Sequence, residues 1–262
     1  PYTTKFPISV LENYNLNNTD GLVAGNQDAA DILRDNGYTG AVKVMPQLGV
    51  DEQLFSPQSQ PELAEQLGLT AEEFIIGFIG RFVPEKGLLT LIKALTQIKH
   101  LPWKLLLLGR GELEAKILAE AELAGIRNRV NIIPSVPHEQ VPEYINLMDT
   151  LVLPSQTTYE FKTLTAVGWK EQFGHVLIEA MACKVPVVGS DSGEIPNVIG
   201  EAGLVFPEQD ATALSQCLSS LIEQPNFAKS LGEAGYERVM ENYTNLALAK
   251  QQLDFYRELV NN

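Results

Sequence analysis

The 262-residue sequence is poor in cysteine and histidine, with two residues of the first type and three of the second. Cys183 and Cys217 both lie in segments with helical patterning and do not form the dense disulfide framework of a small secreted protein. We interpret them as free thiols in a reducing compartment and expect a cytoplasmic protein. The few histidines provide neither a Ser-His-Asp arrangement nor a cluster of metal ligands, so we expect no metal requirement.

Long apolar runs and basic charge are also scarce. No stretch approaches the roughly 20 apolar residues of a membrane-spanning helix, and no signal peptide is visible. The formal net charge is −14, with 19 Lys and Arg against 33 Asp and Glu. This charge argues against non-specific nucleic-acid binding, and no basic amphipathic helix is present to bind anionic lipid. Any phosphate site must therefore be local, made of a few cations and backbone amides.

The sequence does contain short apolar runs, of the length of a strand, that alternate with stretches in which apolar residues recur at helical spacing. The predicted strands are 74–80, 104–109, 130–136, 150–155, 185–190 and 203–206. Near-continuous apolar strands that alternate with helices are typical of a parallel sheet covered on both faces. The handedness of such connections favours an α/β, doubly wound, Rossmann-like domain.

The two ends of the chain differ from this rhythm. Residues 1–50 hold one strand-helix-strand unit, which is too little for a domain: it is either the end of a missing domain or a part that packs on the main sheet. A connector rich in proline and glutamine follows, and we place the Rossmann-like domain at residues 51–242. The chain then ends in helices, and we expect the last one, 243–262, to cross back toward the N-terminal part.

The segment GFIGRFVPEKG, residues 77–87, is the first of two candidate anion sites. In open parallel sheets, ligands bind beyond the carboxyl ends of the strands, where helix N-termini point. Arg81 follows directly on an apolar strand, and Lys86 is predicted to open the next helix. A lysine there costs about 0.3–1 kcal/mol against the helix dipole, and a bound anion would reverse that penalty. The alternative is that both cations are solvated surface groups.

The segment EQFGHVLIEA, residues 171–180, is the second candidate anion site. Gly174 permits a sharp turn and a close approach of the backbone to a ligand. The free amides at the start of the new helix would belong to Gly174, His175, Val176 and Leu177. Free donors and the helix dipole together favour a phosphate or a sugar hydroxyl at this position.

Two carboxylates accompany this second site. Glu179 lies among apolar residues of the predicted helix, so its charge needs a partner. Two vicinal hydroxyls, such as those of a ribose, would provide one, at about 1.5–3 kcal/mol for each charge-assisted hydrogen bond. The alternatives are an internal arginine or the cap of a neighbouring helix. Glu171 precedes the turn and would lie over a ligand bound at the start of the helix. The alternative is that Glu171 is a solvated charge in a loop.

Taken together, these segments resemble the retaining glycosyltransferases of family 4, which use nucleotide-sugar donors and have the two-domain GT-B architecture. The resemblance rests on GRFVPEKG, on the two glutamates within EQFGHVLIEAMACKVPVVGSDSGEIPNVI, and on GLVFPEQD. It implies that this chain is the donor-binding half of an enzyme that transfers a sugar from a UDP-, GDP- or ADP-sugar to a hydroxyl acceptor (a sugar, a glycan or a lipid-linked group). It also implies that the N-terminal acceptor domain is mostly missing, that the fragment alone is inactive, and that no cofactor is required.

The same resemblance implies roles for individual residues, and makes Arg81, Lys86 and Glu171 the predicted catalytic residues. The two cations would hold the donor diphosphate and stabilise the negative charge that develops on it as it leaves. Glu171 would orient hydroxyls of the transferred sugar rather than attack it, Glu179 would bind the ribose, and the amides of residues 174–177 would hold the sugar and the distal phosphate. The floor and base pocket would be formed by Gly80, Gly109, Pro134, Ser135 and Val136.

Some features remain open at this level. The segment 156–170 is longer than the usual link of the family and could cover the donor sugar or meet the acceptor. His175 lies beside the expected pocket, either as a proton donor or as a packing and hydrogen-bonding residue. Two other classes share the architecture: a nucleotide-sugar epimerase or phosphorylase, and a non-catalytic nucleotide-sugar-binding module. Peripheral contact with the cytoplasmic face of a membrane also stays open, because lipid-linked acceptors are common for such enzymes.

Overall fold

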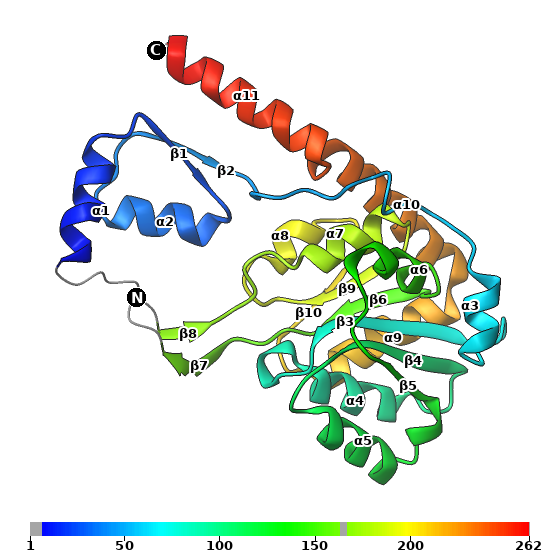
Figure 1. Ribbon diagram of the computed structural model, residues 1–262. Helices are drawn as coiled ribbons and strands as arrows, with labels where there is room; N and C mark the ends of the chain where they lie inside the picture. Colours follow the sequence, from blue (N-terminus) through cyan, green and yellow to red (C-terminus); the bar gives the residue numbers. More distant parts are fainter. Residues whose placement is uncertain (1–6, 163–166, 262) are drawn as a thin grey trace.

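A parallel sheet of six strands forms the centre of the protein (Figure 1), in a computed structural model that describes residues 7–162 and 167–261. The strands are β3 (Phe74–Arg81), β4 (Trp103–Arg110), β5 (Val130–Ile133), β6 (Thr150–Leu153), β9 (Val187–Ser190) and β10 (Leu204–Phe206). Their order across the sheet is β10-β9-β6-β3-β4-β5. Numbered one to six along the chain, this is the doubly wound order of Rossmann-like folds. The fold class predicted from the sequence is therefore confirmed.

Helices cover both faces of this sheet. One face carries α4 (Leu88–Gln97), α5 (Glu114–Leu123) and α9 (Ala211–Glu223); the other carries α6 (Val141–Ile145), α7 (His175–Ala182) and α8 (Ile195–Ile199), with α10 (Pro225–Asn242) packed on α7. In α4 the apolar residues Leu88, Leu91, Ile92 and Leu95 recur at helical spacing, and all are buried. Each such side chain contributes about 1.5–3 kcal/mol on burial. Among the described helices, none is both long enough and apolar enough to cross a membrane.

The residues before this sheet form a unit of their own. It consists of α1 (Ile8–Asn17), β1 (Gly21–Ala24), α2 (Gln27–Asp35) and β2 (Ala41–Val44). β1 and β2 pair in parallel with each other and are not part of the six-stranded sheet. The last helix, α11 (Asn245–Asn261), runs from the end of α10 to this unit (Figure 1), where Phe255 and Leu259 pack so close that a side chain at Gly21 would clash with them.

The two positions at which the sequence predicts domain boundaries lie side by side. Val50 and Thr244 form a parallel bridge, in which the Val50 amide donates to the Tyr243 carbonyl at 2.9 Å and the Asn245 amide to the Val50 carbonyl at 3.1 Å. The chain therefore passes between the N-terminal unit and the main sheet twice, at adjacent points. We call this bridge, residues 49–50 against 243–245, the hinge.

Several short elements were not expected from the sequence. α1 has no buried residue, and its large apolar side chains Ile8, Val10 and Leu11 are exposed, while α8 is too short to show a period. The segment predicted as a loop at 156–170 contains an antiparallel hairpin, β7 (Thr158–Lys162) and β8 (Val167–Trp169). The strand predicted to reach residue 136 ends at Ile133, because the following proline has no amide hydrogen to continue the ladder.

Gly87 marks the point where the chain leaving β3 meets the chain leaving β6. Its φ is +66°, in the left-handed region, and a Cβ atom there would lie 1.7 Å from the carbonyl oxygen of Pro154. Backbone strain and steric overlap would therefore act together in any substitution with a side chain.

We expect Gly87→Ala to lower the free energy of unfolding by about 2–4 kcal/mol, since strain and overpacking add. Urea denaturation measures the change. Gly25→Ala is the control, because a Cβ atom at Gly25 would meet nothing within 4 Å. Similar losses in the two variants would contradict the close approach at Gly87.

Candidate functional site

The sheet has one topological switch point, between β3 and β6. The chain leaving β3 continues into α4 on one face, and the chain leaving β6 leads to α7 on the other. Where neighbouring strands diverge in this way, a crevice opens at their carboxyl ends, and ligands of doubly wound folds bind there. The hairpin of β7 and β8 and the N-terminal unit lie at the same end of the sheet (Figure 1).

Glu171 lies at this switch point and is held by loops from three adjacent strands. Lys86, after β3, places its Nζ atom 2.5 Å from Glu171 Oε2, and Ser155, after β6, donates its hydroxyl to the same oxygen at 2.7 Å. After β9, the Glu194 amide donates to the Glu171 carbonyl at 3.0 Å, and the Glu171 amide donates to the Ser192 hydroxyl at 3.5 Å. Glu171 is only 8% exposed. It is therefore a buried, paired carboxylate and not a solvated loop charge.

Lys86 is not in the first turn of a helix, as the sequence suggested. Residues Pro84–Lys86 form a 3-10 turn, Gly87 is left-handed, and α4 begins at Leu88. The helix-dipole argument for this lysine was wrong, because the turn separates it from the helix. Its charge is balanced by Glu171 instead. Its Nζ atom also lies 5.2 Å from the ring centre of Trp169.

Arg81 ends β3 and points into solvent. Its side chain is 67% exposed and lies 3.6 Å from a carboxylate oxygen of Glu85. Exposed ion pairs of this kind contribute about 0–1 kcal/mol, so this contact leaves the guanidinium available to an anion. The structure thus places Lys86 inside the site, paired with Glu171, and Arg81 at the exposed rim of the site.

Glu179 projects from α7 toward the turn that follows β5. Its neighbours Ile178, Ala180 and Met181 are fully buried, whereas its own side chain is 15% exposed. Its Oε1 atom lies 3.2 Å from Nε2 of His138, whose side chain is 63% exposed. The partner is thus a surface histidine, and not the internal arginine that the sequence left open. The sequence analysis did not predict His138 at the site, although its place just after the predicted base pocket at residues 134–136 could have indicated it.

Cys183 lies at the end of the same helix. Burial raises the pKa of its thiol to about 12, and the charge of Glu179 adds to the effect, while a hydrogen bond from Asn146 opposes it. The thiol therefore stays neutral at physiological pH and adds no charge beside the carboxylate. Both cysteines are unpaired, which confirms the prediction of free thiols.

The start of α7 supplies fewer free amides than predicted. Gly174, with φ of +81°, precedes the helix, and the Leu177 amide donates back to the Gly174 carbonyl at 2.8 Å. The Leu177 amide, which we predicted to be free for a ligand, is therefore already bonded. The amides of Gly174, His175 and Val176 have no acceptor inside the helix. The His175 ring points to the connector, with Nε2 2.9 Å from the Leu48 carbonyl oxygen. The structure thus favours hydrogen bonding over proton donation for this residue.

The predicted floor residues gather at the carboxyl ends of β3, β4 and β5. Gly80 and Gly109 are register partners, and a Cβ atom at Gly109 would lie 1.9 Å from the Gly80 carbonyl oxygen. A hollow of about 280 Å³ opens beside them and is lined by Gly109, Arg110, Glu114, Leu118, Arg127, Ile132 and Pro134. Ser135 and Val136 follow in the turn before His138 and do not line it.

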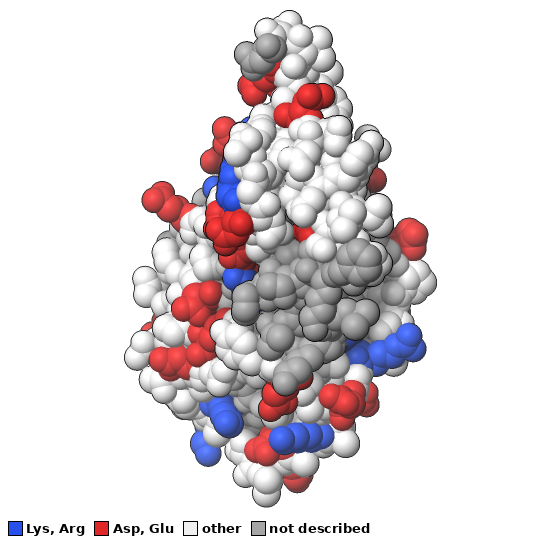
Figure 2. Space-filling model, turned by 90° about the vertical axis from the view of Figure 1, so that its left-hand side faces the viewer, with Lys and Arg blue, Asp and Glu red and all other residues white. Residues whose placement is uncertain are grey.

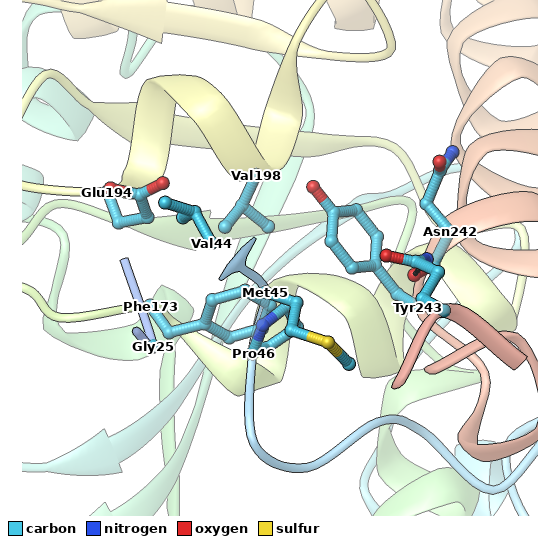
Figure 3. Close-up of a pocket in the computed structure, with 10 residues that line it drawn as sticks. Gly25, Val44, Met45, Pro46, Phe173, Glu194, Val198, Asn242 and Tyr243 are labelled. Atoms are coloured by element: carbon cyan, nitrogen blue, oxygen red, sulfur yellow. Dashed lines mark hydrogen bonds between the residues drawn. The ribbon is translucent and has the colours of Figure 1, made fainter. Parts of the chain in front are cut away.

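A second hollow, of about 170 Å³, lies between the N-terminal unit and the main sheet. Figure 3 shows Glu194 and Val198 along one side of it, Phe173 below Glu194, and Asn242 and Tyr243 at the right. Neither hollow includes Arg81, Lys86 or Glu171. Lys86 and Glu171 lie outside both hollows and contact each other directly. The candidate site is therefore defined by these side chains and not by a cavity.

The end of the molecule that carries the hairpin bears no continuous basic patch on its described surface. Figure 2 shows this face, with lysine and arginine side chains scattered among aspartate and glutamate. Among the described residues, no three His, Cys, Asp or Glu side chains gather as metal ligands would. Positive charge at the site therefore comes from single cations and a helix end.

We expect Lys86→Met to lower the free energy of unfolding by about 3 kcal/mol, because it leaves Glu171 buried without a cation. Lys86→Met combined with Glu171→Gln removes both charges and should recover much of that loss. Urea denaturation measures both variants, and Lys93→Met, on the exposed side of α4, is the control. A double variant as unstable as the single one would show that the pair does not carry this energy.

Comparison with known proteins assigns the chain to a family. The model of the family described as "Glycosyl transferases group 1" matches residues 59–238. N-acetyl-alpha-D-glucosaminyl L-malate synthase of Bacillus anthracis is 27% identical over 80% of this chain and 52% of that protein. D-inositol 3-phosphate glycosyltransferase of Segniliparus rotundus is 28% identical over 83% of this chain and 47% of that protein. The chain thus spans about half the length of the curated relatives it matches.

Solved structures give the same result. Sucrose-phosphate synthase from Thermosynechococcus elongatus matches with a TM-score of 0.77 and 30% identity, over 97% of this chain and 61% of that chain. HepE of Anabaena, solved in complex with UDP, matches with a TM-score of 0.80 over 94% of this chain and 66% of that chain, and at 20% identity this likeness is one of fold. The family match includes every predicted site residue. The chain belongs to the glycosyl transferases group 1 family, and its six-stranded sheet is the Rossmann-like half of a GT-B fold.

Proposed function

We propose that this chain is the donor-binding half of a retaining glycosyltransferase, which transfers a sugar from a nucleoside diphosphate sugar to a hydroxyl group. The observation that carries the proposal is the contact of Lys86 with Glu171 at the switch point of the sheet. A phosphate needs a cation and a sugar hydroxyl needs an acceptor, and this pair offers both at one place. Among the relatives is a GDP-mannose-dependent mannosyltransferase of Mycolicibacterium smegmatis, and HepE has been solved with UDP-glucose.

The diphosphate of the donor lies between Lys86, Arg81 and the start of α7. Binding draws Lys86 from its carboxylate to the phosphate, and Arg81 turns from its weak contact with Glu85. The amides of His175 and Val176, at the positive end of the helix dipole, meet the sugar and the distal phosphate. When the sugar–phosphate bond breaks, these groups stabilise the charge on the leaving diphosphate. The scheme requires no metal and no cofactor.

The nucleoside lies along the carboxyl ends of β4 and β5. Glu179 accepts the two ribose hydroxyls, and its present partner His138 is exposed enough for a ligand to displace it. The base then reaches the turn at Ser135 and Val136, with Gly109 and Pro134 below it. A carboxylate that is almost buried yet open on one side suits such a role, because the ligand completes its hydrogen bonds.

Glu171 orients the transferred sugar and does not attack it. After Lys86 moves to the phosphate, the Ser155 hydroxyl still donates to Glu171 Oε2, and the backbone contacts with Ser192 and Glu194 keep the residue in position. The acceptor oxygen bonds to the anomeric carbon on the face that the phosphate leaves, and the departing phosphate oxygen takes the acceptor's proton. Retention of configuration follows. In this proposal the acceptor binds to a part of the enzyme that this chain does not include, so the isolated chain binds donor without transferring sugar.

A panel of UDP, GDP, ADP and their sugar conjugates tests the proposal. We expect at least one of these nucleotides to raise the melting temperature of the chain. Glu179→Ala should weaken binding of that nucleotide about 10- to 150-fold, from the loss of charge-assisted hydrogen bonds. Calorimetry measures the affinity, and Glu143→Ala, an exposed acid on α6, is the control. No melting shift with any nucleotide at millimolar concentration would refute the proposed function.

Charge reversal at the rim tests the phosphate site. We expect Arg81→Glu to reduce the affinity for the bound nucleoside diphosphate at least about 100-fold, because it replaces an attraction with a repulsion. Lys93→Glu makes the same change in net charge on the exposed side of α4 and should leave the affinity within about twofold. Equal losses in both variants would show a general electrostatic effect and not a contact of Arg81 with phosphate.

A further inference from the structure

The hairpin of β7 and β8 lies at the switch point but has no role in the scheme above. Its two ends are fixed to the main sheet. At the outgoing end, Thr157 donates its amide and its hydroxyl to the carboxylate of Glu208, each at 2.6 Å, and the Gln156 amide donates to the Glu85 carbonyl at 2.8 Å. The returning end runs directly into Glu171, which is held by Lys86 and Ser155. The two ends of the hairpin are therefore held beside the site.

The returning strand is also attached to the N-terminal unit. Lys170 forms an ion pair with Asp28, in the first turn of α2. The side chain of Asn26, which caps that helix, donates to the Gln172 carbonyl at 3.0 Å. Residues on both sides of Glu171 are thus anchored, and Trp169 lies at the end of β8, between the hairpin and these anchors.

Trp169 is half-buried although it belongs to a protruding hairpin. It contacts the site: the Lys86 ammonium lies 5.2 Å from the indole centre and 2.5 Å from Glu171 Oε2. Indole, cation and carboxylate are therefore contiguous. The position of the ammonium near the ring is expected from the attraction between a cation and the negative face of an aromatic ring.

We propose that the indole of Trp169 is the surface on which the transferred sugar stacks, so that it positions the sugar and helps to select it. The inference rests on the proposed function, in which Glu171 binds hydroxyls of that sugar and Lys86 moves to the phosphate. A pyranose has hydroxyls at its edge and C–H bonds on its faces. A site for it therefore needs polar groups beside an apolar, flat surface, and binding pockets commonly combine aromatic walls with a few placed polar groups.

The same ring serves both states of the site. Before donor binds, it shares the Lys86 charge with Glu171. Once the diphosphate takes Lys86, the ring loses its cation, and the weakly positive C–H groups of the sugar replace it on the same face. Stacking thus depends on the sugar and not on the nucleotide, which separates this role from those of Arg81 and Glu179.

Tryptophan fluorescence makes the proposal testable, since the chain has two tryptophans. The other, Trp103, is 1% exposed, donates to the Ile98 carbonyl, and begins β4 at the end of the sheet opposite the site. We expect UDP-glucose, GDP-mannose or ADP-glucose, whichever is bound, to change the emission of the 262-residue chain more than the matching UDP, GDP or ADP does. Trp169→Phe should abolish that extra change and retain most of the affinity.

Trp169→Ala completes the test. Calorimetry should show an affinity for the nucleotide sugar about three- to tenfold weaker, with the affinity for the nucleoside diphosphate changed less than about twofold. Tyr159→Ala is the matched control, because it removes a 73% exposed aromatic residue from the same hairpin and should change neither affinity. Melting temperatures of all variants without ligand show whether the fold is intact.

The outcomes separate this inference from the proposed function. If nucleotides and nucleotide sugars bind and Trp169→Ala weakens both equally or neither, the stacking role is refuted and the donor site stands. If the nucleoside diphosphate alone changes the emission as much as its sugar conjugate, the ring responds to Lys86 and not to a sugar, which also refutes the role. If no nucleotide binds at all, the proposed function fails and the inference fails with it.

Discussion

A single buried carboxylate organises the candidate site. Glu171 is nearly inaccessible to water, and a charge in that position is tolerated only with a cation and hydrogen-bond donors around it. Lys86 and Ser155 meet this need at its side chain, while Ser192 and Glu194 bind its backbone. These four residues follow three adjacent parallel strands. By contacting all of them, the buried Glu171 therefore fixes the loops after β3, β6 and β9 relative to one another.

The ion pair also explains why the hollows of the structure do not coincide with its chemistry. Lys86 and Glu171 satisfy each other's charge by direct contact, and so they leave no open space between them. His138 and Glu179 form a second side-chain contact, a hydrogen bond of 3.2 Å, in which the histidine is 63% exposed. In the proposed function, the bound donor replaces the Lys86–Glu171 and His138–Glu179 contacts with its own contacts to these residues.

The sequence was sufficient for the sheet, because the strands depend on local patterns, and the same kind of pattern located the segments of the candidate site. Apolar runs predicted the strands, and the rule that ligands bind at carboxyl ends of parallel strands singled out the segments of Arg81 and Gly174. The partners could not be predicted, since they depend on which loops the strand order brings together. His138 is 41 positions from Glu179, and Lys86 is 85 positions from Glu171. The hairpin was missed because its strands are short, with five residues in β7 and three in β8, so that no period could be recognised.

The hinge has a mechanical consequence. The chain crosses between the N-terminal unit and the main sheet at two points that are hydrogen-bonded to each other, so a rotation about that short line strains little backbone, whereas pulling the two parts apart would break the bridge. His175, at the start of α7, binds the carbonyl of Leu48 next to this pivot. The start of α7 is thus hydrogen-bonded to the segment beside the hinge, so in the proposed function a tilt of α7 on donor binding would be passed to the N-terminal unit.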